Sequence, residues 1–103
     1  MPIQISTQSA NYTLALKDAD TQITLTNKTN ITIKIPTDNS VKFPIGTVIF
    51  LQSEGTGVVT ISLSTGVILQ SLNSARKLGG KDTAAFLIKK ATNTWFLAGT
   101  IKN

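Results

Sequence analysis

The sequence predicts an all-β protein, specifically an antiparallel β-sandwich of jelly-roll or immunoglobulin type that folds as a single domain. Apolar and polar residues alternate in several short runs, and turn-forming residues separate these runs at intervals of about 8–12 residues. No stretch shows helical periodicity, and the runs are rich in Thr and Ile, whose branched side chains favour a pleated sheet. The 103 residues suffice for one domain with its own core, and no internal repeat is evident.

Residues 1–10 form a segment whose place in the fold the sequence leaves open. Ile3 and Ile5 alternate with polar residues, as in a strand, before a polar stretch begins at Ser6. The segment is either an ordinary first strand or an N-terminal arm that adds a strand to the sheet edge of a partner. In the second case Ile3 and Ile5 are the expected partner-binding residues. The β-sandwich domain itself is expected to span residues 11–103.

Four runs after residue 10 alternate strictly, which is typical of antiparallel strands with one buried face. Their polar members are mostly Thr, Ser and Lys, and these are expected to face the solvent. The apolar members are expected to face the core, and they are Tyr12, Leu14, Leu16, Ile23, Leu25, Ile31, Ile33, Ile35, Val59, Ile61 and Leu63.

A different pattern marks residues 83–99, which predict a β-hairpin with its turn at Asn93-Thr94 and with arms that are apolar on both faces. Residues 48–51 are also apolar on both faces, so we place this strand beside the hairpin. Such strands need cover on both sides, and the chain contains no predicted helix to supply it. A second subunit is the expected cover. The expected interface residues are Val48, Phe50, Phe86, Ile88, Trp95 and Phe96.

The two segments that most resemble binding loops are predicted to be turns. Asp18 and Asp20 could share a cation, but their position between two strands favours a turn closed by side-chain hydrogen bonds. Gly55 and Gly57 resemble a phosphate-binding loop only superficially, because the Lys and the helix that should follow are missing. They predict a tight hairpin turn instead.

Few residues are suited to catalysis or metal binding. The chain has no Cys and no His, and its carboxylates number only five. No Ser or Thr has an evident general base, and Lys89 and Lys90 are expected to lie at the surface. Trp95 could stack on a sugar ring, although its neighbours favour a place in the core or at a subunit contact. We therefore expect no enzymatic activity, no bound metal and no cofactor.

The net charge of +5 arises from basic residues that are spread along the chain. Solvated strand faces explain most of them, and an anionic partner such as an acidic capsid surface, lipopolysaccharide phosphate or DNA is the functional alternative. The aromatic residues lie in apolar runs rather than among the basic ones, which argues against a nucleic-acid partner. No signal peptide or membrane span is evident, so we expect a soluble product made in the cytoplasm without membrane insertion.

Three segments carry a recognisable order of turn and core residues, and a shorter pattern precedes them. The segments are 43–49 (FPIGTVI), 55–61 (GTGVVTI) and 85–99, which starts AFLIK and ends TNTWFLAG; the shorter pattern is YTL at 12–14 with DAD at 18–20. In this order they resemble a β-sandwich module of tailed-bacteriophage virion proteins, which occurs in tail fibres and in small head or tail accessory proteins. The resemblance extends over residues 11–101.

The resemblance implies a non-enzymatic protein located on the virion, usually as a trimer. The chain is expected to consist of the module and a short N-terminal segment, without the shaft that a tail fibre needs. A trimeric capsid decoration (cement) protein that binds the major capsid protein or other virion proteins is thus the first hypothesis. A tail-fibre or receptor-binding component is the second, and a carbohydrate-binding module that recognises a host surface glycan through Trp95 is the third.

Overall fold

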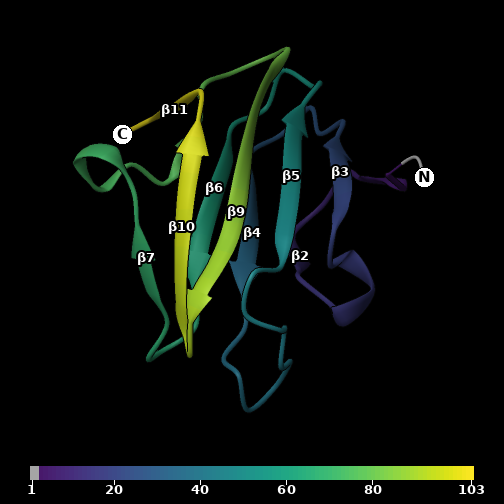
Figure 1. The fold of residues 1–103 in the computed structure, drawn as a ribbon. Helices are drawn as coiled ribbons and strands as arrows, with labels where there is room; N and C mark the ends of the chain where they lie inside the picture. Colours follow the sequence, from purple (N-terminus) through teal and green to yellow (C-terminus); the bar gives the residue numbers. More distant parts are fainter. Residues whose placement is uncertain (1–2) are drawn as a thin grey trace.

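From β1 to β9, successive strands alternate between two sheets that pack face to face (Figure 1). The computed structural model describes residues 3–103. Its strands are β1 (Ile5–Gln8), β2 (Tyr12–Thr13), β3 (Thr21–Leu25), β4 (Ile31–Ile35), β5 (Val48–Ser53), β6 (Val59–Leu63), β7 (Ile68–Gln70), β8 (Lys77–Leu78), β9 (Thr83–Ala91), β10 (Thr94–Gly99) and β11 (Ile101–Lys102), with 3₁₀ turns η1 (Leu16–Asp18) and η2 (Leu72–Ser74). The strand order is β1-β3-β5-β9-β10-β7 in the first sheet, called sheet A, and β11-β8-β6-β4-β2 in the second, called sheet B.

The β-rich single domain is confirmed, but the strand directions differ from the antiparallel arrangement that the sequence predicts. The sheets are mixed: β1, β3 and β5 are parallel neighbours, as are β2, β4 and β6, and β7 runs parallel to β10. Antiparallel pairing joins β5 to β9 to β10 and β6 to β8 to β11. From β1 to β6 the chain changes sheet with each strand and returns to each sheet in its original direction, whereas β8 and β9 return in the opposite direction. Alternation of apolar and polar residues indicates that a strand has one buried face. It does not indicate whether the neighbouring strand is parallel or antiparallel.

The β3–β4 unit and the β5–β6 unit are stacked coils with one constant register. Thr21 lies opposite Ile49 in sheet A and Ile31 lies opposite Val59 in sheet B, an offset of 28 residues in both sheets. The connection between β5 and β6 therefore crosses from one sheet to the other, and the predicted hairpin turn at Gly55 is wrong. A structural repeat exists although the two coils have little sequence in common.

The turns of these coils also lie one above the other. The Gly57 N–H donates to the Asn27 carbonyl at 3.0 Å, and the Asn30 side-chain oxygen accepts from the Val58 N–H at 3.0 Å. The Asn11 side chain accepts from the next coil in the same way, through the Thr32 N–H at 2.9 Å. Asparagine side chains therefore complete backbone pairing where the strands end.

The core lies between the two sheets and consists mainly of the predicted inward-facing residues. Ile23 from sheet A and Ile33 from sheet B are both fully buried, as alternation requires. Leu16 is an exception, because it is 56% exposed. The strand that begins at Tyr12 ends after two residues, and the chain then turns into η1, which carries Leu16 away from the core.

The C-terminal hairpin is confirmed, together with its predicted neighbour. β9 and β10 pair antiparallel around a turn in which Asn93 has a φ of 53°. β5 pairs with β9 on the other side, with Phe50 opposite Phe86. The two-faced strands thus form the middle of sheet A.

Gly57→Ala should destabilise the fold, because a Cβ at this position would lie 2.1 Å from the Thr29 carbonyl oxygen in the turn of the preceding coil. Overpacking typically lowers the free energy of unfolding by about 1–3 kcal/mol, which urea denaturation measures. Gly66→Ala is the control, because a Cβ there would meet no atom within 4 Å and only its positive φ of 96° opposes the change. Equal stability of the two variants would contradict the close stacking of the turns.

Candidate functional site

The outer side of sheet A, which faces away from the core, carries a continuous set of apolar side chains. Phe50 lies opposite Phe86 and Val48 lies opposite Ile88 across β5 and β9, and Ile88 lies opposite Phe96 across β9 and β10. Paired residues in a ladder point to the same side of the sheet, so these side chains share one surface. We call this surface, defined by Val48, Phe50, Phe86, Ile88 and Phe96, the outer apolar face.

The side chains of the outer apolar face are only partly covered by their neighbours. Phe50 is 42% exposed, and the other four are half-buried. The rings of Phe50 and Phe86 lie against each other with their centroids 6.3 Å apart. Five of the six residues predicted for the oligomer interface are therefore brought together, on a surface that a partner can reach.

The outer side of sheet B differs clearly from this face. β4 exposes Thr32 and Lys34, and β6 presents Thr60 and Ser62 on the same side. These side chains are polar or charged and suit contact with water. Of the two broad sides of the molecule, the one on sheet A has the composition of a subunit contact.

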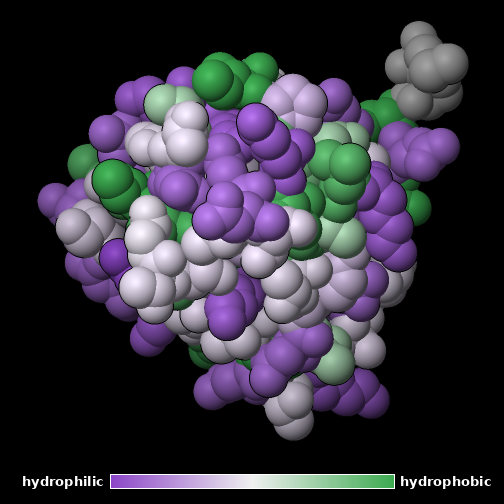
Figure 2. All heavy atoms as spheres, turned by 90° about the horizontal axis from the view of Figure 1, so that it is seen from below, coloured by the Kyte–Doolittle hydropathy of each residue, from purple (hydrophilic) through white to green (hydrophobic). Residues whose placement is uncertain are grey.

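The end of the molecule near residues 36–47 is also largely polar. Seen from this end, hydrophilic and neutral residues cover most of the surface, and hydrophobic residues form separate spots nearer its margin (Figure 2). Ile45, on this loop, is 68% exposed. Single exposed apolar residues of this kind are normal on protein surfaces.

Trp95, the sixth residue predicted for the interface, lies in the core instead. It is 1% exposed, and its ring meets the ring of Phe43 edge-on, with centroids 5.3 Å apart. The alternation along β10 turns Trp95 and Leu97 inward and Phe96 outward. The assignment of Trp95 to the interface is therefore wrong, and its ring offers no exposed platform for a sugar.

Residues 5–8 form β1, an edge strand of the chain's own sheet A. β1 runs parallel to β3, with Ile5 opposite Gln22, and its Ile5 side chain points outward. Ile3 and Ile5, the residues predicted for a partner-binding arm, are 42% and 65% exposed. The segment thus has the position of an ordinary first strand, with apolar side chains left at the surface.

The far edge of β1 has no neighbouring strand in the described chain. β3 and its continuation donate N–H groups to the carbonyls of Gln4 and Gln8. Backbone groups alternate in direction along a strand, so those of Ile5 and Thr7 point to the open edge. This edge can accept a further strand.

Lys89 is buried, contrary to the surface position that we expected for it. Its ammonium group donates to Asp38 Oδ1 at 2.7 Å and to the Phe43 carbonyl at 2.6 Å, and the residue is 1% exposed. The Lys89 backbone also bonds to Thr47 and Gly46. This lysine therefore fastens the long loop between β4 and β5 to β9.

Asp18 and Asp20 act as turn residues, as predicted. Asp18 is 3% exposed, and its Oδ2 accepts hydrogen bonds from the Tyr12 hydroxyl at 2.7 Å and the Ala15 N–H at 2.8 Å. Asp20 has a φ of 58°, and its Oδ1 accepts from the Val48 N–H at 3.1 Å. Both carboxylates thus hold η1 and the following turn against neighbouring strands.

Residues 3–103 contain neither a cluster of metal-binding side chains nor a helix that could span a membrane. No three side chains among the His, Cys, Asp and Glu of this range are grouped so that they could hold a metal ion. None of its helical segments has the length and apolar character needed to cross a membrane.

Comparison of the chain with protein-family models, curated proteins and solved structures returned no match.

Sequence reasoning missed the burial of Lys89, although a signal for it was present. β9 alternates strictly, so Lys89 falls on the same side as the buried Ala85 and Leu87. A charged residue at the end of an inward-facing series needs a partner of opposite charge. That partner, Asp38, is distant in sequence, and only the folded loop brings it to Lys89.

Asp38→Ala should destabilise the protein more than Lys89→Met does. Loss of Asp38 leaves a buried ammonium without its counter-charge, and breaking a buried pair in this way costs about 3–5 kcal/mol of free energy of unfolding. Lys89→Met removes the buried charge itself, and the remaining Asp38 side chain, which is 14% exposed, can reach water. Urea denaturation compares the two variants. Equal losses would mean that the loop contacts, and not the buried charge, determine the cost.

The Tyr12 hydroxyl should lose its proton at a higher pH than the hydroxyl of an ordinary tyrosine. Burial, the hydrogen bond to Asp18 and the negative charge of Asp18 raise the pKa of Tyr12 from 10.0 to about 12. Since the folded-state pKa is the higher one, the contribution of Tyr12 to stability is complete below pH 10 and is lost as the pH rises through about 12. Tyr12 is the single tyrosine, so the ultraviolet absorbance of tyrosinate reports it alone. A folded-state midpoint equal to that of the urea-unfolded chain would exclude the contact with Asp18.

Proposed function

We propose that this chain is a non-enzymatic virion structural protein of a tailed bacteriophage, specifically a trimeric capsid decoration protein. The outer apolar face is the observation that carries the proposal, because it leaves apolar side chains at the surface of one subunit. The number of subunits and the place on the virion rest on the resemblance of segments 43–49, 55–61 and 85–99 to phage modules.

The size and composition of sheet A support self-association. The molecule measures 34 × 33 × 20 Å along its principal axes. One broad side of such a molecule can supply the surface of about 800 Å² per partner that stable complexes bury. Phe50, Phe86 and Phe96 provide the aromatic side chains that are enriched at the centre of interfaces.

The buried polar groups support a structural role. Lys89 and Asp38 bond to each other, and Asp18 bonds to Tyr12 and the backbone. These hydrogen bonds hold loops and turns in place, which is a structural use for each of the groups. A catalytic group needs a side chain that is free to meet a substrate.

Attachment to the capsid would use β1. Its open edge presents the backbone groups of Ile5 and Thr7, and an exposed strand of the major capsid protein or of another virion protein could pair with them. Ile3 and Ile5 would then pack against that partner.

A tail-fibre or receptor-binding component is the second candidate, since it would use the outer apolar face in the same way. A carbohydrate-binding module that acts through Trp95 has lost its main support, because the indole ring lies in the core.

Sedimentation equilibrium should give about three times the monomer mass for the unmodified protein, and Phe86→Glu should shift it to the monomer because a charge in an apolar contact is costly. Thr32→Glu is the matched control, because it places the same charge on the exposed side of sheet B and should leave the oligomer intact. Circular dichroism checks that both variants fold. An unmodified protein that sediments as a monomer at micromolar concentration would remove the basis for the interface.

The same samples test the virion assignment. Unmodified protein added to phage heads that lack it should bind and raise their resistance to osmotic shock, because a ligand of the intact lattice stabilises it by mass action. Thr7→Pro, which removes one N–H from the open edge of β1, should weaken this binding while the oligomer persists. Binding only to tails or to host cells would overturn the decoration role in favour of the second candidate.

A further inference from the structure

β1 has a polarity opposite to that of its neighbours in sheet A. Ser6 lies opposite Ile23 and Gln8 lies opposite Leu25, so these two polar side chains are on the core side of the sheet. At the corresponding positions, the other strands of sheet A carry mainly apolar side chains, among them Ile23, Leu25, Ile49, Leu51, Leu87 and Leu97. Polar residues at core-side positions break the pattern that the rest of the sheet follows, and such departures are expected where a site is built.

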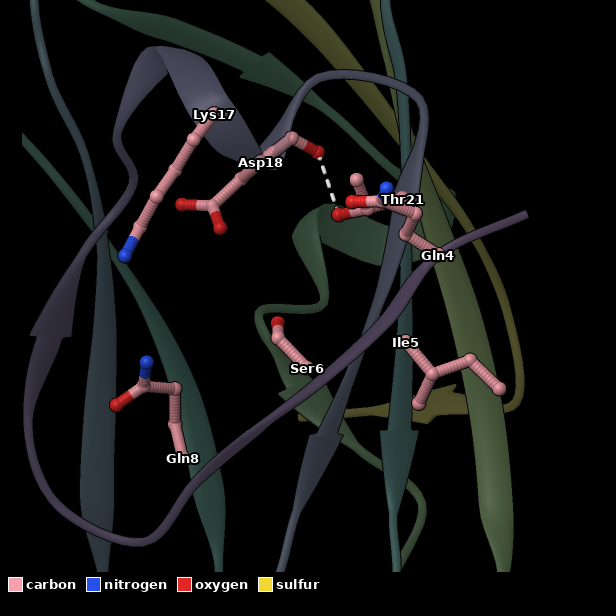
Figure 3. A pocket seen from close by; sticks show the side chains of 7 residues that line it. All are labelled: Gln4, Ile5, Ser6, Gln8, Lys17, Asp18 and Thr21. Atoms are coloured by element: carbon pink, nitrogen blue, oxygen red, sulfur yellow. Dashed lines mark hydrogen bonds between the residues drawn. The ribbon is translucent and has the colours of Figure 1, made fainter.

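The polar side of β1 faces a hollow. The hollow has a volume of about 140 Å³ and lies between β1 and η1 (Figure 3). Figure 3 shows the side chains of Ser6 and Gln8 on one side of it and those of Lys17 and Asp18 on the other. The complete lining is Gln4, Ile5, Ser6, Gln8, Lys17, Asp18 and Thr21.

The Ser6 hydroxyl is the one group of the hollow that is both buried and unpartnered within residues 3–103, and Asp18 offers a further acceptor. Asp18 uses Oδ2 to accept from Tyr12 and Ala15, and no hydrogen bond of residues 3–103 involves its Oδ1. A buried polar group without a partner is costly, and it is usually explained by a ligand or a water molecule.

We propose that this hollow is a binding site for one neutral polyhydroxylated ring, such as a single pyranose sugar. A hydroxyl group both donates and accepts, so adjacent hydroxyls can donate to Asp18 Oδ1 and accept from Ser6, Gln8 or Lys17. The lining holds one carboxylate and one ammonium group, whose charges offset each other, and this favours a neutral ligand over an ion.

The volume suits the ring of such a ligand. A cavity of about 150 Å³ in another protein holds benzene, so the hollow has room for the six ring atoms of a pyranose, whereas most of its hydroxyl groups must lie at or beyond the rim. The hollow is not fully enclosed, so substituents of the ring can extend outward. The ring could be a free sugar or the terminal residue of a glycan, because both present the same hydroxyl groups.

The site is distinct from the outer apolar face. Ser6 lies on the inner side of sheet A and Asp18 lines the same hollow, whereas Phe50 and Phe86 lie on the outer side of the sheet. Sugar binding and self-association can therefore be tested separately, and the loss of one says nothing about the other.

The experiment is a two-dimensional NMR titration of the full chain with glucose, galactose and N-acetylglucosamine, and with their methyl glycosides. At least one sugar should shift the amide signals of Ser6, Gln8, Asp18 and Thr21 saturably, with a millimolar dissociation constant. Binding of the methyl glycoside as well as the free sugar would identify a glycan end as the source. Binding of the free sugar alone would identify a small metabolite.

Ser6→Ala supplies the discriminating variant. The hydroxyl makes no hydrogen bond in the described chain, so its removal should leave thermal stability unchanged or higher while sugar affinity falls at least several-fold. Ser53→Ala is the matched control, because Ser53 carries a second buried and unpartnered hydroxyl on β5 that does not line the hollow. The Ser53→Ala variant should bind the sugar with the same affinity as the unmodified protein.

Three results would overturn the proposal. The first is the absence of saturable shifts with every sugar, which would leave the hollow to water. The second is a shift that acetate or phosphate causes more strongly than any sugar, because the site would then select anions. The third is an equal effect of Ser6→Ala and Ser53→Ala on affinity.

Discussion

The constant register between residues 21–35 and residues 49–63 is the constraint on which most of the structure depends. It brings the turn of one coil into contact with the turn of the next, and this close approach leaves no room for a side chain at Gly57. At the strand ends, the N–H groups of Thr32 and Val58 donate hydrogen bonds to the side chains of Asn11 and Asn30. Stacking in both sheets at once places Ile23 and Ile33 in a shared core. The antiparallel strands β9 and β10 then extend sheet A beyond the coils.

The sequence was sufficient to predict what depends on one residue and its immediate neighbours. The faces of β4 and of the 83–99 hairpin follow from alternation, and the pairing of β5 with β9 follows from their shared two-faced composition. It was not sufficient for features that depend on distant segments. Parallel direction, the crossover at Gly55 and the contact of Lys89 with Asp38 all require knowledge of which strand returns beside which. Trp95 illustrates the limit, because its neighbours allowed both the core and the interface.

The outer side of sheet A faces the solvent and its inner side faces the core, and β1 departs from the usual polarity on both sides. On the outer side Ile5 is exposed at the edge of the sheet, and Gln22 separates it from Phe50. On the inner side Ser6 and Gln8 keep the space beneath the strand polar. A strand with this pattern gains little from burial in its own subunit. Its backbone hydrogen bonds to β3 and the residue that continues β3 are therefore the main contacts that hold it in place.

The stacked coils also determine how this half of the molecule can change in length. A single residue inserted within β3 would turn the side chains after it to the opposite side of the sheet, and Ile23 and Leu25 could not both remain in the core. A complete coil added beside β1 would preserve every inward and outward position, because each coil pairs only with its neighbours. This half of the molecule can therefore be lengthened only by whole coils, each of which consists of two strands and their two connections.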